Sequence, residues 1–236
     1  MAKTKKEVMQ GELINIEPLR ATKLIVPIEG TTPIILKGKT RSYEREEIFK
    51  QGHPKGTKIP HELDTKLNQN LWEHLITSIH WRDKIETFDD YSLYTKEMWE
   101  DLMKNNAPCI PMKAFKESFK QVFISFGFKE STKRNGTDLD RTLMVLDQLT
   151  PITFQKVEID QHLAKSNTVG GTNVLTDCNI FYGWKAELHL SHVDAVFPSE
   201  TILSIVRHAG EYLGLGSRRG EGFGRYQING AIKGVM

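Results

Sequence analysis

Two amphipathic segments with helical spacing, each flanked by strand-like runs, constrain the fold of this chain more than any other feature. The first forms one apolar stripe at positions i, i+4, i+7, i+8 and i+11, made of Phe115, Phe119, Val122, Phe123 and Phe126. Pro111 suits the first turn of this helix because its missing N–H costs nothing there, and Gly127 suits its end. A second helix is expected after Pro198, with Ser199 as its N-cap. Its stripe contains Ile202, Ile205, Val206, Ala209 and Leu213.

Strand-like runs lie on both sides of these helices, at residues 11–36, 143–146, 152–159, 180–190 and 225–232. In the run 180–190, Trp184, Ala186, Leu188 and Leu190 face one way, and Lys185, Glu187, His189 and Ser191 face the other. This period of two is typical of a half-buried antiparallel strand. The order strand, helix, strands, helix, strand therefore predicts an α+β fold, with a ferredoxin-like antiparallel sheet, helices on one face and long insertions.

The length of 236 residues suits one or two domains, and we expect a single domain over residues 11–236. Residues 1–10 are polar and are expected to form a flexible tail. Polar segments at about 37–104 and 160–176 are interpreted as insertions into the domain. Residues 37–62 show no clear periodicity. Residues 63–104 are expected to be mixed, largely helical or irregular, and the composition of residues 166–173 predicts a loop.

Composition excludes several classes of protein. No run approaches about 18 apolar residues, so we expect no membrane-spanning helix. The N-terminus, Met1 to Glu7, lacks the apolar run of a signal peptide. Cys109 and Cys178 are too few for a disulfide scaffold or a zinc site of four cysteines. A cytoplasmic protein without a membrane partner is the resulting expectation.

The net charge of +2 hides a strongly patterned sequence. Residues 37–58, 101–136 and 207–236 carry local charges of +4, +4 and +3, whereas residues 83–101 carry −5. Charge runs are often ordinary solvated surface. The alternative is a basic groove for a nucleic acid and an acidic patch for a neighbouring subunit.

The most specific segment runs from Gly214 to Tyr226 and holds five glycines and three arginines. Repeated glycine lets backbone N–H groups turn toward an anion, and arginines make bidentate phosphate contacts. The segment follows a helix and precedes a strand, and it lacks a Gly-Lys-Ser/Thr ending, so it is neither a Rossmann nor a Walker loop. A flexible glycine hairpin is the plainer alternative. Phe223 could stack on a base or pack in the core, and packing is favoured.

The second segment is Pro108 to Lys116, where a strand end, a proline and the start of a lysine-bearing helix come together. A helix N-terminus attracts phosphate through its free N–H groups and its dipole. Lys113, Lys116 and Lys120 share one face of this helix. Alone, they would be interpreted as a solvated face opposite the phenylalanine stripe.

Together, the Pro-x-Ile-Pro run at Pro108–Pro111, the lysine Lys116 and the loop from Gly216 to Arg225 resemble the RAMP superfamily of CRISPR-associated proteins. Glu117 stands where the family often has glycine. The resemblance implies a sheet like that of RNA-recognition motifs, which binds single-stranded RNA along a basic face. It also implies repeated subunits along the strand, or an endoribonuclease of the same fold.

The predicted nucleic-acid-binding residues come from the two segments and from a basic insertion that could lie over the strand. They are Lys37, Lys39, Arg41, Lys113, Lys116, Lys120, Gly216, Ser217, Arg218, Arg219, Gly222, Phe223 and Arg225.

Catalysis is left open but not favoured. A histidine could serve as the general base of a metal-independent nuclease, and His53, His61, His74 and His80 lie in the region that the resemblance indicates. Asp89 and Asp90 lie upstream of Pro108, as does a catalytic aspartate in another branch of the family. His189 and His192 lack a third ligand nearby in sequence, so no metal or cofactor is expected.

These observations favour a non-catalytic protein that binds single-stranded RNA, with single-stranded DNA left open. Its expected partners are other copies of itself or the subunits of a ribonucleoprotein complex. The alternatives are an endoribonuclease of the same fold, and a structural assembly protein that touches no nucleic acid.

Overall fold

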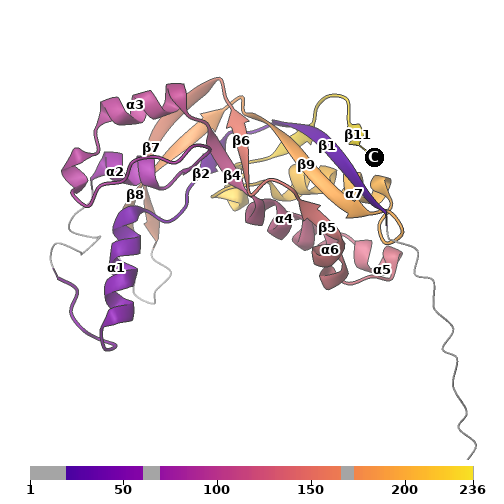
Figure 1. Cartoon of the computed structure of the whole chain (residues 1–236), viewed down its shortest axis with the longest axis horizontal. Coiled ribbons are helices and arrows are strands. Elements are labelled where there is room, and N and C mark those ends of the chain that lie inside the picture. The colour runs from indigo at the N-terminus through magenta and orange to yellow at the C-terminus, as the bar shows by residue number, and fades with distance from the viewer. Residues whose placement is uncertain (1–19, 61–69, 166–172, 236) are drawn as a thin grey trace, which may run out of the picture.

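The computed structural model describes residues 20–60, 70–165 and 173–235. The predicted tail at 1–10, the first part of the predicted strand run at 11–36, His61, and most of the predicted loop at 166–173 lie outside these residues. The described chain forms a large and a small lobe, which lie side by side along the long axis (Figure 1).

The large lobe contains an antiparallel sheet in the order β10-β1-β9-β6-β4-β3. Its strands are β1 (Ala21–Gly30), β3 (His80–Trp81), β4 (Pro108–Pro111), β6 (Leu149–Thr153), β9 (Lys185–Val193) and β10 (Tyr226–Ile228). Two short strands, β5 (Leu143–Val145) and β11 (Lys233–Val235), pair with β9 and β1. The chain order β1, α4, β6, β9, α7, β10 with the sheet order β10-β1-β9-β6 is the ferredoxin-like arrangement. The predicted α+β fold is therefore confirmed.

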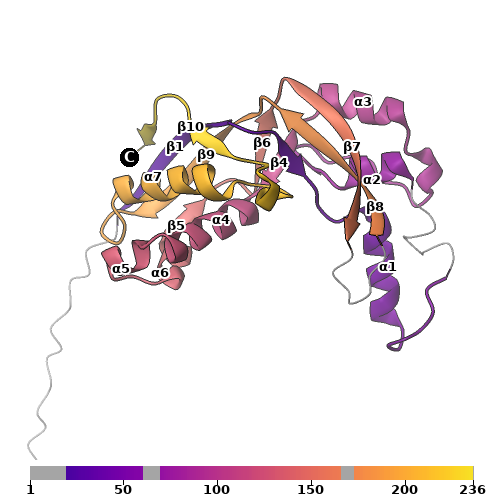
Figure 2. The same ribbon diagram turned by 180° about the vertical axis from the view of Figure 1, so that it is seen from behind.

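The helices of the large lobe lie on one side of this sheet (Figures 1 and 2). They are α4 (Met112–Ser125), α5 (Phe128–Thr132), α6 (Gly136–Thr142) and α7 (Ser199–His208), which continues as a π-helical turn, η3 (Ala209–Leu213). The stripe of α4, from Phe115 to Phe123, packs in one core with the stripe of α7 and with Leu24, Val26 and Ile28 of β1. Because alternate residues of β1 are buried, its other residues face away from the helices.

The small lobe is built on a three-stranded sheet in the order β2-β8-β7. Its strands are β2 (Ile34–Leu36), β7 (Lys156–Lys165) and β8 (Asn173–Tyr182), and its helices are α1 (Arg41–Gly52), α2 (Leu71–Thr77), a short 3-10 turn η2 (Tyr91–Leu93) and α3 (Lys96–Asn105). Asn179 of β8 is fully buried. Its side chain accepts from Trp99 Nε1 and donates to the Leu75 carbonyl, both at 2.9 Å. This one side chain therefore ties α2 and α3 to the sheet.

Both predicted insertions contribute to the small lobe, and the structure corrects several details. Residues 41–52 form helix α1, which the sequence does not reveal because α1 has no apolar stripe. It is capped by Thr40 and held by ion pairs such as Arg45–Glu73 at 2.8 Å. The predicted insertion at 160–176 is largely the strands of a β7–β8 hairpin. The single-domain organisation over residues 11–236 stays a prediction.

Two predicted strands each divide between the sheets. The run 152–159 breaks after Thr153 into β6 and β7, and the run 180–190 breaks at Gly183 into β8 and β9. Gly183 has φ +59°, a conformation that glycine adopts without strain. The predicted strand 225–232 is likewise shorter, ending at Ile228 before β11.

The cap of α7 also differs from the expectation. Pro198 precedes the first residue of the helix, and Ser199 lies inside it. The Ser199 hydroxyl instead contacts His192 Nε2 at 3.1 Å and the Asp194 carboxylate at 3.3 Å. None of the described helices is both long and apolar enough to cross a membrane.

Candidate nucleic-acid interface

The glycine-rich loop from Gly214 to Arg225 lies against β2 and joins the two lobes. The Ser217 N–H donates to the Ile35 carbonyl at 2.9 Å, and the Gly224 N–H donates to the Pro33 carbonyl at 2.7 Å. The Leu215 N–H closes the loop on the Gly224 carbonyl at 2.9 Å. The loop is therefore a fixed connection between β2 and the large sheet, and not a free hairpin.

Close packing within the protein explains two of the loop's glycines. Gly216 has φ +75°, and a Cβ there would lie 2.4 Å from the Ile35 oxygen. Gly224 has φ +74°, and a Cβ there would lie 1.9 Å from the Leu215 oxygen. At Gly222 the φ of +92° favours glycine, but a Cβ would meet open space. The sequence suggests that these glycines make room for a ligand. At Gly216 the protein's own backbone at Ile35 occupies that space, so packing within the protein also accounts for this glycine.

Arg218 is held by the protein from three directions. Its guanidinium lies 3.1 Å from Asp160 on β7, pairs with Glu221, and stacks 5.1 Å from the centroid of the Phe223 ring. Its φ of +55° is left-handed, which is uncommon for a residue with a side chain. Phe223 in turn packs against the buried cluster of Ile35, Cys178 and Ile180, in agreement with the preference for core packing. Arg218 therefore anchors the loop to the small lobe.

The other two arginines of the loop face a surface hollow of about 480 Å³. Its lining residues are Gln121, Tyr212, Leu213, Arg218, Arg219, Gly220 and Arg225. No carboxylate is among them. Arg225 Nη1 is buried and has no hydrogen-bond partner among the described residues, whereas the Tyr212 ring is 47% exposed. We call this site the arginine hollow.

The predicted lysines of α4 do not line the arginine hollow, to which α4 contributes Gln121. Lys113 is exposed and lies 3.7 Å from Glu117, and Lys120 forms a 2.6 Å ion pair with Asp140 of α6. Lys116 is partly exposed, and no ionic partner is found for it among the described residues. The two sequence motifs therefore lie near each other, but the lysines of α4 and the arginines of the loop do not line the same hollow.

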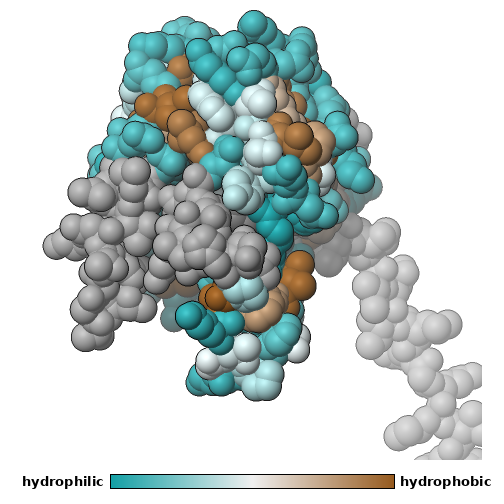
Figure 3. All heavy atoms as spheres, turned by 90° about the vertical axis from the view of Figure 1, so that its left-hand side faces the viewer, coloured by the Kyte–Doolittle hydropathy of each residue, from teal (hydrophilic) through white to brown (hydrophobic). Residues whose placement is uncertain are grey.

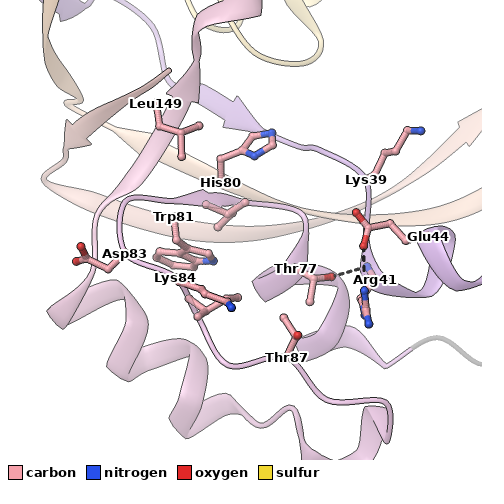
Figure 4. Close-up of a pocket in the computed structure, with 12 residues that line it drawn as sticks. Lys39, Arg41, Glu44, Thr77, His80, Trp81, Asp83, Lys84, Thr87 and Leu149 are labelled. Carbon is pink, nitrogen blue, oxygen red and sulfur yellow. Dashed lines mark hydrogen bonds and ion pairs between the residues drawn. The ribbon is translucent and has the colours of Figure 1, made fainter. Parts of the chain in front are cut away.

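A second, smaller cleft of about 260 Å³ is lined by three cations of the first insertion and by two carboxylates, those of Glu44 and Asp83 (Figure 4). Lys39 and Arg41 lie at the start of α1, His80 on β3, and Lys84 and Asp83 on the segment that follows β3. The positive charge of Arg41 is partly neutralised, because its guanidinium lies 3.5 Å from the Glu44 carboxylate and 3.7 Å from the Asp89 carboxylate. We call this site the basic cleft.

Lys37, at the end of β2, lies outside the lining of both sites. Partial desolvation lowers its pKa, although the nearby Cys178 and Asp177 oppose that shift. Its charge also helps to lower the pKa of His74, which is lowered mainly by burial. Lys37 thus belongs to a polar group between β2, α2 and β8.

Of the described candidate histidines, His80 alone lines the basic cleft. His53 is bonded through Nδ1 to the Phe49 carbonyl at 2.8 Å and stacks on the Phe49 ring. His74 Nε2 is buried without a hydrogen-bond partner among the described residues. His80 therefore has an exposed ring beside the cations of the basic cleft, whereas the exposed His53 lies beside Lys50 and Lys55 in a separate hollow.

The two candidate aspartates have structural contacts. Asp89 pairs with Arg41, and Asp90 caps η2 by accepting from the Ser92 N–H at 2.9 Å and the Ser92 hydroxyl at 2.7 Å. These hydrogen bonds lower the pKa of Asp90. Within residues 20–60, 70–165 and 173–235, no group of three or more His, Cys, Asp or Glu residues is arranged to hold a metal ion.

Sequence reasoning missed several residues of these sites. Tyr212 and Gln121 line the arginine hollow, and Lys84 lines the basic cleft. Tyr212 lies two residues before Gly214, the first glycine of the run, which is a usable signal. The charge pattern does not single out Lys84, because this lysine lies in the segment 83–101, whose net charge is negative.

No protein-family model and no curated protein sequence matches the chain. Among solved structures, the chain is similar to one from the Type III-B Cmr-beta complex bound to cognate target RNA, with 14% identity, a TM-score of 0.39, and coverage of 92% of this chain and 61% of that one. It is also similar to Cmr6 from Pyrococcus furiosus, with 11% identity, a TM-score of 0.39, and coverage of 89% and 98%. This chain therefore spans less than two thirds of the Cmr-beta chain. The fold assignment rests on the strand order given above.

Proposed function

We propose that this protein binds a single nucleic-acid strand, RNA in preference to DNA, through the arginine hollow and the basic cleft. The observation that carries the proposal is the arginine hollow, whose charged lining residues are all arginines. The preference for RNA comes from the resemblance of the two sequence motifs to the RAMP superfamily. In this proposal the protein binds the strand as a subunit of a ribonucleoprotein complex or together with further copies of itself. It does not cut the strand.

The chemistry of the arginine hollow suits a phosphodiester. A buried donor without an acceptor costs about 1–3 kcal/mol, so a movement of the Arg225 side chain that brings Nη1 to a phosphate oxygen would recover that cost. Arg219 adds a second guanidinium, and charge-assisted bonds of this kind are stronger than neutral ones. The half-exposed Tyr212 ring offers a surface on which a base can stack.

Strand binding is tested by fluorescence anisotropy with a labelled unstructured RNA and a DNA of the same sequence. The Arg219→Ala/Arg225→Ala variant should bind at least tenfold more weakly and show a smaller salt slope, by about 0.7 for each lost phosphate contact. Lys185→Ala is the matched control, because Lys185 is an exposed cation on β9, outside both sites. Equal affinity of the double variant and the wild type would exclude the arginine hollow as the binding site. Tighter binding of DNA would reverse the proposed preference.

One observation favours a second candidate, a metal-independent endoribonuclease. His80 lines the basic cleft together with Lys39, Arg41 and Lys84 (Figure 4). A neutral imidazole can take the proton of a 2′-hydroxyl, and neighbouring cations can stabilise the phosphate charge. Incubation of labelled RNA with the protein and EDTA separates the two functions. Intact RNA supports binding alone, whereas cleavage that His80→Ala abolishes supports the nuclease.

A further inference from the structure

One member of the apolar stripe predicted for α4 stays outside the core. Phe115 and Phe123 are fully buried, whereas Phe126 is 40% exposed. Helix α4 ends at Ser125, and Phe126 has the non-helical dihedral angles φ −113° and ψ +24°. Its ring therefore leaves the stripe and lies at the surface. Single exposed apolar residues are common, so the neighbours of Phe126 decide whether it belongs to a contact surface.

A second exposed ring lies beside Phe126. Tyr212 is 47% exposed, its ring centroid lies 5.2 Å from that of Phe126, and the two ring planes differ by 31°. These residues follow α4 and α7, which lie side by side on one face of the large sheet (Figure 2). We call the pair of rings the aromatic platform.

The aromatic platform is attached to the core through a third ring. His208 lies 5.9 Å from Phe126 and 5.7 Å from Tyr212. Its Nδ1 lies 2.8 Å from the Ser204 carbonyl oxygen, and its ring contacts Phe128, which packs against the core. Rings that are already held in place lose little side-chain freedom when a ligand binds.

The aromatic platform is continuous with the arginine hollow. Tyr212 lines the hollow and also contacts Phe126, and Gln121 of α4 lines the same hollow. A strand whose phosphate lies at Arg219 or Arg225 therefore reaches the platform through Tyr212.

The charges around the aromatic platform suit a base better than a phosphate. The charged residues within two positions of Phe126, Phe128, His208 or Tyr212 are Lys129, Arg207, Glu130 and Glu211, all exposed. The two positive and two negative charges cancel. The C-terminal end of α4 lies directly before Phe126, and the carbonyl groups of a helix end disfavour an anion. A base, in contrast, is uncharged and stacks on an aromatic ring.

Other surfaces of the protein offer no such pair of rings. A hollow of about 550 Å³ on the opposite face of the large sheet has no Phe, Tyr or Trp in its lining. Its one imidazole, His189, is bound by Asp147 and Glu187. Figure 3 looks onto the small-lobe end and shows apolar patches between hydrophilic residues there. The exposed aromatic residues of that lobe, Tyr43 and Tyr91, contact no other exposed ring within residues 20–60, 70–165 and 173–235.

We propose that Phe126 and Tyr212 form a base-stacking site for the bound strand, beside the arginine hollow that holds its phosphates. The inference rests on the proposed function, because it concerns the same strand. It places that strand on the helix side of the large sheet, over the C-terminal end of α4, and not on the open face of the sheet. Because every base has a π-face, the platform adds affinity without selecting a sequence.

The test measures fluorescence anisotropy of the full-length protein with two labelled probes of equal length, an unstructured RNA and a chain of abasic ribose-phosphate units. Both probes carry the same phosphates, but only the RNA has bases to stack. The wild type should bind the RNA at least about tenfold more tightly than the abasic chain. In Phe126→Ala/Tyr212→Ala this ratio should fall at least about fivefold. The salt slope of RNA binding should stay at the wild-type value, because the phosphate contacts remain.

Two further variants control this measurement. Tyr91→Ala removes a 38% exposed ring from the small lobe, outside both proposed sites, and should keep the wild-type ratio. Phe126→Tyr/Tyr212→Phe keeps both rings and should also keep the ratio. The second variant separates a loss of stacking from a loss of folding.

The inference is overturned if the wild type binds both probes equally, if the double alanine variant keeps the wild-type ratio, or if the ring-preserving variant loses it. Weaker RNA binding by Arg219→Ala/Arg225→Ala in any of these cases means that the aromatic platform alone is rejected. Wild-type affinity of that arginine variant, together with a lowered ratio in the double alanine variant, rejects the arginine hollow alone. A wild type that binds neither probe rejects both proposals.

Discussion

The guanidinium of Arg218 lies 3.1 Å from the carboxylate of Asp160, which joins the glycine-rich loop to β7 across 58 residues of sequence. The same arginine pairs with Glu221 within the loop and covers the Phe223 ring. Since phosphate would have to displace two carboxylates, Arg218 is the least available of the loop's three arginines. Arg219 and Arg225 remain for a ligand.

The Arg218–Asp160 pair is expected to couple the loop to the small lobe by about 0.5–1 kcal/mol, because both side chains are partly exposed and screened. A double-mutant cycle with Arg218→Gln and Asp160→Asn, read by urea unfolding, measures this coupling. The Arg82–Asp83 pair, at 3.0 Å and more exposed, is the control and should show a smaller value. Equal coupling in both pairs would contradict a structural role for Arg218.

Gly224→Ala is expected to destabilise the protein by roughly 2–4 kcal/mol, as the sum of left-handed strain and overpacking. The added Cβ would lie 1.9 Å from the Leu215 oxygen. Gly220→Ala is the matched control in the same loop, because its Cβ meets open space and its φ is not positive. Thermal or urea unfolding of both variants measures the difference. Similar stabilities of the Gly224→Ala and Gly220→Ala variants would show that the loop shifts to accommodate the added methyl group at little cost.

Asn179→Ala is expected to cost about 2–4 kcal/mol of unfolding free energy, because it leaves Trp99 Nε1 and the Leu75 carbonyl buried without partners. Asn105→Ala removes an exposed amide that contacts Asp101, and should change stability by less than about 0.5 kcal/mol. Urea unfolding compares the two. A small effect at Asn179 would mean that water replaces its contacts.

Both cysteines are expected to resist iodoacetamide in the folded protein at pH 8 and to react once urea unfolds it. Burial raises the pKa of the Cys109 thiol to about 11 and also raises that of Cys178, so the reactive thiolate is scarce. Rapid labelling of either native thiol, followed by mass spectrometry, would refute this.

The raised pKa of Cys109 also gives a pH dependence with a definite sign. The unfolded thiol ionises near 9.0 and the folded thiol near 11, so this contribution to stability is complete below pH 9 and is lost as the pH rises toward 11. The wild type should therefore lose more stability between pH 8.5 and 10.5 than Cys109→Ala does. Parallel losses in the two proteins would exclude Cys109 as the cause.

The sequence by itself determined the elements whose signal is local. Helix α4 was predicted between Pro111 and Gly127 because a phenylalanine stripe at helical spacing must bury one face. The order of strands and helices likewise predicted the α+β sheet, since few arrangements bury all of these apolar faces. The glycine-rich loop was identified from composition alone.

Only the tertiary structure decided which residues meet across the chain. Helix α1 has no apolar stripe and depends on contacts such as Arg45–Glu73, and the run 180–190 divides between two sheets because Gly183 turns the chain. The arginines 218, 219 and 225 look alike in sequence, yet Asp160 binds Arg218, while Arg225 Nη1 is buried without an acceptor in the part of the chain that the structure describes. Sequence gives the type of each charge, but the free energy of a charge depends on which neighbour the fold brings to it.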